Sequence, residues 1–254
     1  NNGILDYGEA VMMTISIKNI GTADANGVNA VLSSADPYVT ITDNSATYGT
    51  IAAGQTISVP NGFAISIANN VPDGHPILFS MQLTEAKATW AVSFNDVAHA
   101  PILGYLSYTI SDPTGNNNGK LDPGETANFI ITAKNTGSSA ANNVAGQLVC
   151  SDPYITINTN NQSFGIISAG GTKTATYSVV ASASTPAGFV SNYILNLTGN
   201  LGVTGSGNFT AIVGQIPVLI IDLDGTKNSG PAMQTCIQAL GIGGRTPLYP
   251  SDCP

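Results

Sequence analysis

The chain has 254 residues, of which 9% are charged and 43% hydrophobic, with 28 glycines and a formal net charge of −8. This length favours about two domains, and the composition favours short strands joined by small-residue turns over helical bundles. Seven Lys and Arg residues are too few to build a basic face for nucleic acid, and no apolar run is long enough for membrane insertion.

Alternating apolar residues predict a first domain over residues 1–103. Its strands are expected at 10–18, 28–32, 39–41, 56–59, 63–67, 77–83 and 89–94. Residues 42–49 are expected to form a polar loop, and the strand that should open the domain is missing. The chain is therefore expected to be a piece of a longer polypeptide.

A second domain is predicted over residues 104–214. Its strands are expected at 105–110, 126–134, 144–149, 155–158, 173–180, 192–198 and 206–213. Seven short strands without helical periodicity favour an immunoglobulin (Ig)-like sandwich. The Cys…Trp…Cys pattern of antibody domains is absent. Cys150 is expected to be a buried free thiol, and Cys236 and Cys253 could pair in an exported chain.

Residues 215–254 read as the start of an α/β module, with an apolar strand at 217–224 and a helix at 232–240. The strand ends in Asp222-Leu223-Asp224-Gly225-Thr226, which resembles the opening signature of haloacid dehalogenase phosphatases. The lysine and second acidic pair of that mechanism do not follow. The predicted fold class is all-β: two tandem Ig-like β-sandwiches followed by the first strand and helix of an incomplete α/β module.

One stretch of the sequence occurs twice, at an offset of 116 residues. Residues 116–125 (NNNGKLDPGE) precede an alternating run and Asn135-Thr136-Gly137, while residues 2–9 (NGILDYGE) precede a similar run and Asn19-Ile20-Gly21. The match continues through Asp-Pro-Tyr at 36–38 and 152–154. Such self-similarity is typical of tandem structural repeats.

The complete copy of this stretch resembles a calcium loop of the D-x-[DN]-x-[DN]-G-x₅-E type. Thr114 stands where the pattern has its first Asp, and Asp112 could supply the missing carboxylate. The expected ligands are Asp112, Asn116, Asn118, the Lys120 carbonyl, Asp122 and Glu125.

The first copy is cut short and keeps Asn2, the Ile4 carbonyl, Asp6 and Glu9. The alternative for both copies is an Asn-Gly turn whose carboxylates hold backbone amides. Each loop is expected to face the preceding domain. Calcium is the only cofactor predicted, and no catalytic residues are predicted.

The repeated loop, its strand ending in Lys-Asn-x-Gly, and Asp-Pro-Tyr-[Ile/Val]-Thr-Ile together resemble the Ig-like modules of large secreted Bacteroidota proteins. Those proteins include gingipain-like peptidases and adhesins exported by type IX secretion. The resemblance implies an extracellular or cell-surface location. It implies neighbouring domains of the same polypeptide as partners, with cell-surface or secretion-system proteins as further candidates. No peptidase Cys/His dyad can be placed in the chain.

The favoured function is therefore a non-catalytic, calcium-stabilised stalk or adhesive segment of a secreted or cell-surface protein. The alternative is the accessory region of a secreted peptidase whose catalytic domain lies outside this chain. Carbohydrate binding is a weaker third hypothesis, because the aromatic residues form no platform that spacing can reveal.

Overall fold

The computed structural model describes residues 2–214 together with Pro231, Met233 and Thr235. The predicted α/β module, including Asp222 and Asp224, lies outside the described residues apart from those three positions. Cys236 and Cys253 lie outside them as well. Within residues 2–214 the chain is all-β, as predicted, and no described helix is long and apolar enough to cross a membrane.

The first module contains the strands β1 (Leu5–Asp6), β2 (Ala10–Lys18), β3 (Ala25–Ser33), β4 (Val39–Asp43), β5 (Ser45–Ile51), β6 (Thr56–Ile67), β7 (His75–Thr84) and β8 (Thr89–His99). They form two sheets, of order β1-β8-β7-β3-β5 and β2-β6-β4. All pairs are antiparallel except β1 with β8.

The second module contains β9 (Leu103–Ser111), β10 (Thr126–Asn135), β11 (Ala141–Val149), β12 (Ile155–Ile157), β13 (Asn161–Ile167), β14 (Thr172–Ala181), β15 (Phe189–Thr198), the 3₁₀ turn η1 (Asn200–Gly202) and β16 (Thr204–Val213). They form one curled sheet of order β12-β14-β10-β9-β16-β15-β11-β13. Strand β9 is the link between its two halves, because it pairs antiparallel with β10 and touches β16 in parallel at Leu103 and Gly205.

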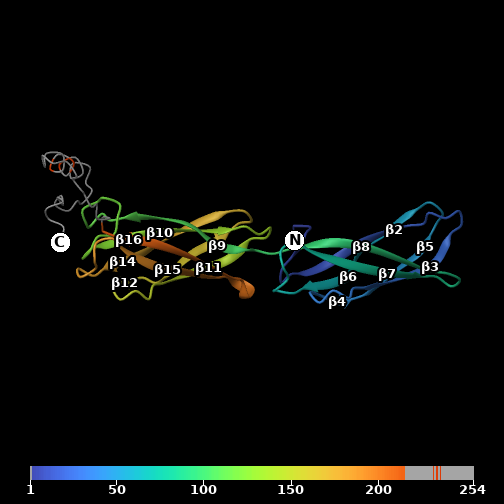
Figure 1. Ribbon diagram of the computed structural model, residues 1–254. Coiled ribbons are helices and arrows are strands. Elements are labelled where there is room, and N and C mark those ends of the chain that lie inside the picture. Colours follow the sequence, from blue (N-terminus) through green and yellow to red (C-terminus); the bar gives the residue numbers. More distant parts are fainter. Residues whose placement is uncertain (1, 215–230, 232, 234, 236–254) are drawn as a thin grey trace, which may run out of the picture.

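Each module has its own hydrophobic core, made by the inward residues of alternating strands. In β10, Ala127, Phe129, Ile131 and Ala133 are all buried, and the residues between them are not. This is the period of two that a strand with one buried face requires. The first core ends at Ala100 and the second begins at Leu103. The modules therefore lie end to end, joined by a short connection (Figure 1).

Two strands were absent from the sequence prediction, which placed a polar loop at 42–49. Strands β5 and β13 alternate polar outward residues with inward Ala46, Tyr48 and Ile51 in one case, and Phe164 and Ile167 in the other. Each also contains a glycine with positive φ, Gly49 or Gly165, opposite a register shift in the partner strand. The glycine bulge interrupts the alternation of inward and outward residues, and the outward residues are polar. The sequence of these strands therefore resembles that of a loop.

The prediction of separate strands at 56–59 and 63–67 is also wrong, because β6 runs through both. Pro60 and Gly62 suggested a break, but they flank a bulge at Asn61, whose φ is 53°. The Thr14 hydroxyl accepts the Asn61 backbone N–H at 3.1 Å, which keeps the bulge attached to β2. Cys150 is free, as predicted, but half-buried instead of buried.

Candidate metal-binding loops and the module junction

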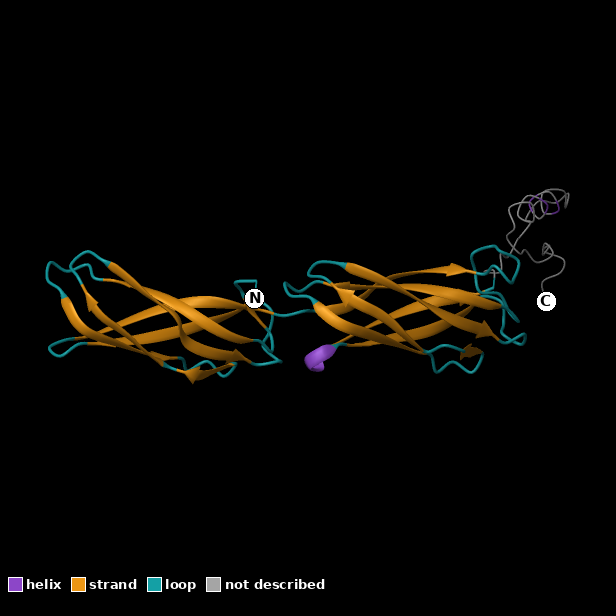
Figure 2. Cartoon of the chain, turned by 180° about the vertical axis from the view of Figure 1, so that it is seen from behind, coloured by secondary structure: helices purple, strands orange, loops and turns teal. Residues whose placement is uncertain are grey.

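The complete loop, residues 112–125, joins β9 to β10 at the end of the second module that is remote from the first (Figure 2). Leu121 is its anchor, since the side chain is fully buried. The Leu121 carbonyl accepts the Gly214 backbone N–H at 2.7 Å, and Leu121 bridges in parallel to Val213. The apolar position of the motif thus fastens the polar loop to the core.

Asp112 organises the turn of this loop. It is only 1% exposed, and its two carboxylate oxygens accept the backbone N–H groups of Asn118 at 2.9 Å and Gly119 at 2.8 Å. Burial alone would raise the pKa of Asp112, but these backbone hydrogen bonds outweigh it and hold the pKa below its ordinary value. Asn117 and Gly119 both have positive φ, so the chain turns sharply here.

The remaining predicted ligands of the complete loop form one hydrogen-bonded group. The side-chain amides of Asn116 and Asn118 donate to Asp122 Oδ2 at 2.7 and 2.8 Å. Glu125 accepts the backbone N–H of Asn116 at 3.1 Å and that of Asp122 at 2.9 Å, one on each oxygen. Lys120 donates its N–H to Asn118 Oδ1 at 2.9 Å.

A cation would fit this group by replacing the amide N–H groups around Asp122. Two partial positive charges already face that carboxylate oxygen, which is where a hard cation would bind. Rotation of the Asn116 and Asn118 amides would present their oxygens in the same direction. The carboxylates of Asp112, Asp122 and Glu125 do not form a cluster. Among the described residues no group of three or more His, Cys, Asp or Glu side chains could hold a metal ion. The ligand set would depend on amide and carbonyl oxygens.

The first loop, residues 2–9, repeats the same contacts at the offset of 116. Asn2 donates its side-chain amide to Asp6 Oδ2 at 2.8 Å, and its Oδ1 accepts the Ile4 N–H at 3.1 Å. Glu9 Oε2 accepts the Asp6 N–H at 3.3 Å. The second oxygen of Asp6 is buried and accepts no hydrogen bond. A buried acceptor without a donor is costly, and a cation ligand would satisfy it.

The first loop faces the following module, contrary to the expectation that it would face the preceding one. Strands β9 and β2 run in the directions that place both loops at the C-terminal end of their modules (Figure 1). Asn2, Asp6 and Glu9 line a cavity of about 420 Å³ together with Ser139 and Asn142 of the second module. The Tyr7 hydroxyl donates to the Ala140 carbonyl at 3.4 Å across the same gap.

Beside this cavity, Asp73 ties the two modules together. Its carboxylate accepts the Ala100 N–H at 2.9 Å, the Ser138 N–H at 3.2 Å and the Ser138 hydroxyl. His99 Nδ1 lies 2.7 Å from Ser138 Oγ. Burial would raise the pKa of Asp73, but the hydrogen bonds from Ala100 and Ser138 outweigh it and lower the pKa.

The sequence patterns do not point to Asp73, Ser138 or His99. One signal was available. The turn Pro72-Asp73-Gly74 corresponds to Pro186-Ala187-Gly188 in the second module, so an acid stands at 73 where the second copy has alanine. The structure shows that this acid contacts Ser138 of the second module.

No protein-family model matches the chain, and no curated protein matches it. Solved structures with weak similarity to the chain include the following two. A protein of unknown function from Porphyromonas gingivalis W83 is 12% identical, with a TM-score of 0.25, covering 84% of this chain and 94% of that one. Red sea bream transglutaminase is 17% identical, with a TM-score of 0.32, covering 85% of this chain and 30% of that one. These scores are too low to support an inference about function.

Proposed function

We propose that the chain is a pair of non-catalytic, Ig-like spacer modules that form a stalk or adhesive segment of a secreted or cell-surface protein. The observation that supports this proposal most strongly is the set of contacts between the two modules. Asp73 of the first module binds the Ser138 backbone and hydroxyl of the second, and Tyr7 donates to Ala140 beside it. A flexible linker would leave the modules free to turn, whereas these contacts favour one orientation.

The Ig-like assignment is supported by the pairing of strands. In the first module the sheet that contains the order β8-β7-β3-β5 faces the sheet β2-β6-β4 across a core of inward residues. In the second module the counterpart order β16-β15-β11-β13 is one half of the single curled sheet, and the core lies inside the curl. Antiparallel strands folded around one core are consistent with the proposed Ig-like sandwiches. The extracellular location and the relation to type IX secretion rest on the resemblance of the repeated motif to secreted Bacteroidota modules.

Calcium is proposed as the ion that stiffens the loops. In the first loop, Asn2, Asp6, Glu9 and the Ile4 carbonyl would hold it, and the buried acceptor Asp6 Oδ1 supports that assignment. This loop lines the cavity between the modules, so a bound cation would neutralise its carboxylates at the junction. In the second loop, Asn116, Asn118, Asp122, Glu125 and the Lys120 carbonyl would act in the same way, with Asp112 holding the turn.

Small-angle X-ray scattering of the whole chain tests the spacer proposal. We expect an extended particle whose maximum dimension matches two sandwiches end to end, and a narrower distribution of dimensions in calcium than in EDTA. A scattering profile of two modules that tumble independently in both conditions would contradict the proposal.

A further inference from the structure

Four neighbouring strands of the second module contain no charged residue. They are β13, β11, β15 and β16, and they make up one half of the curled sheet. None of their residues is Asp, Glu, Lys, Arg or His. One side of these strands faces the core and the other side faces outward. The outward side is called the neutral face below.

The strand register arranges the side chains of the neutral face in rows that cross the sheet. Residues turned to the core alternate with outward residues along each strand. One polar row is Asn161, Gln147, Asn196 and Ser206, and the next row is Ser163, Ala145, Thr198 and Thr204. The third row is Val149, Ile194 and Asn208, and the pairs Asn192–Thr210 and Val190–Ile212 lie beyond it. The face is therefore polar at one end and partly aliphatic at the other.

The aliphatic side chains of the neutral face are open to solvent. The exposed fractions are 38% for Val149, 44% for Ile194, 49% for Val190 and 40% for Ile212. Apolar residues that share one exposed face mark interaction sites, whereas scattered ones are ordinary.

The first module has serines where the second module has its aliphatic row. The turns before β7 and β15 align Ser80 with Ile194. Ser80 pairs with Ser33 and Ser93 on the outward side of its own sheet. The fold therefore does not require an aliphatic residue at this place, and the exposure of Ile194 belongs to the second module alone.

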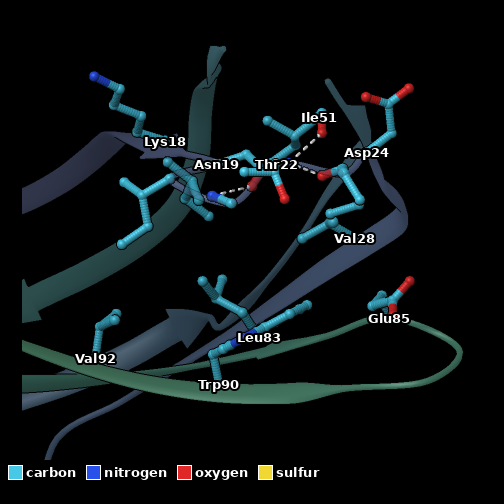
Figure 3. Close-up of a pocket in the computed structure, with 15 residues that line it drawn as sticks. Lys18, Asn19, Thr22, Asp24, Val28, Ile51, Leu83, Glu85, Trp90 and Val92 are labelled. Atoms are coloured by element: carbon cyan, nitrogen blue, oxygen red, sulfur yellow. Dashed lines mark hydrogen bonds between the residues drawn. The ribbon is translucent and has the colours of Figure 1, made fainter. Parts of the chain in front are cut away.

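The neutral face is separate from two cavities of the molecule. A cavity of about 570 Å³ in the first module is lined by Leu83 and Trp90 together with Lys18, Asp24 and Glu85, among others (Figure 3). The cavity of about 420 Å³ lies at the junction. No residue of the neutral face lines either one. Because small ligands are bound in concave sites, the face suits a macromolecular partner.

A second copy of the same face meets the chemical requirements of that partner. A charged partner would bury its charges here without counter-charges, which is unfavourable. Hydroxyl and carboxamide groups both donate and accept hydrogen bonds, so the neutral face is complementary to itself. The chain has a net charge of −8, and two copies repel each other least where neither presents a charge. Asp152, which follows β11, is half-buried and its carboxylate accepts the Asn192 backbone N–H at 2.7 Å.

The neutral face is large enough for a reversible dimer. Four strands spaced about 4.8 Å apart and about ten residues long cover roughly 19 Å by 33 Å, which is about 600 Å² per copy. Two such faces would bury about 1,200 Å², at the lower end of the range for specific interfaces. The expected dimer therefore dissociates on dilution.

We propose that the second module pairs with the second module of another copy of the chain, neutral face to neutral face. Val149 and Ile194 of each copy pack against the sheet of the other, and the rows of Asn, Ser and Thr hydrogen-bond around them. This pairing depends neither on calcium nor on the junction, so it goes beyond the spacer proposal.

Sedimentation equilibrium of the whole chain in EDTA tests the proposal. We expect monomer and dimer in a ratio that changes with concentration. Ile194→Lys should raise the dissociation constant by about tenfold or more, because the interface would bury lysines without a partner. Ile194→Ser, which copies the first module, should weaken the dimer without adding a charge. Circular dichroism of each variant checks that the fold is kept.

Ser80→Lys is the matched control, because it makes the same change of charge at the aligned place in the first module. Its dissociation constant should stay within about twofold of the wild-type value. A chain that stays monomeric up to about 1 mM would overturn the proposal, and so would a dimer that Ile194→Lys leaves intact. A monomeric chain that binds a neutral polysaccharide would overturn it in favour of glycan recognition.

Discussion

The Asp73 carboxylate of the first module accepts the backbone N–H of Ser138 in the second, with 3.2 Å from the nitrogen to each oxygen. The two residues are 65 positions apart in the chain and belong to different modules. The Ser138 hydroxyl donates to the same carboxylate. One acidic side chain therefore fixes a turn of one module to a turn of the other.

Asp73→Ala should loosen the junction without unfolding either module. It removes the acceptor for Ala100 and Ser138, and hydrogen bonds to a charged group contribute about 1.5–3 kcal/mol each, less where solvent reaches them. We expect small-angle scattering to give a broader distribution of distances within the particle. Circular dichroism should stay near that of the wild-type chain. Asp43→Ala is a matched control, because Asp43 is exposed and accepts the N–H of Ser45.

Gly137→Ala and Gly21→Ala form a matched pair at equivalent positions of the repeat. A Cβ at Gly137 would lie 2.2 Å from the Ala100 carbonyl oxygen and 2.6 Å from the Ile102 nitrogen, both of them backbone atoms. At Gly21 the nearest neighbour is Asn19 Oδ1 at 3.2 Å. We expect Gly137→Ala to lower the free energy of unfolding of the second module by about 2 kcal/mol or more, since backbone must shift.

Gly21→Ala should change the unfolding of the first module by less than about 1 kcal/mol. Urea denaturation followed by tyrosine and Trp90 fluorescence can separate the two modules, because Trp90 reports on the first. Equal losses for the two substitutions would show that the connection over Gly137 is not tightly packed.

The low pKa of Asp112 predicts a loss of stability in acid. Its ordinary, unfolded-state value is 3.8 and its folded-state pKa is lower. The stabilisation is therefore fully present above pH 3.8 and is lost as the pH falls through the folded-state pKa. We expect the melting temperature of the second module to fall below about pH 4, and Asp112→Asn to lower it at neutral pH and to flatten this acid dependence. A variant with the wild-type pH profile would show that Asp112 does not hold the turn.

The repeat itself made much of the site predictable. An exact offset of 116 placed two loops with the same residues, and the structure gives both loops the same hydrogen bonds from Asn to Asp and from backbone to Glu. Local hydrogen bonding of this kind depends on residues two to four positions apart, which spacing reveals. The position of Asp112 just before the loop predicts a cation ligand, and its hydrogen bonds from the Asn118 and Gly119 N–H groups are seen only in the structure.

Other features depend on contacts that no local pattern encodes. Strand β13 was missed because its outward Asn, Gln and Ser residues resemble a loop until Phe164 and Ile167 are seen in the core. The direction of β9 decides at which end of the module the loop lies. The junction depends on the hydrogen bonds between Asp73 and Ser138.

The most direct test of the calcium-stiffened account is thermal unfolding of the whole chain in millimolar calcium and in EDTA. A ligand at about 100 times its dissociation constant stabilises the folded state by about 2.7 kcal/mol, which corresponds to at least about 5 °C for a domain of this size. We expect calcium to raise the melting temperature by that amount. Glu125→Gln should remove the increase for the second module, while Glu85→Gln, outside both loops, should retain it. Identical melting curves in calcium and EDTA would contradict the account.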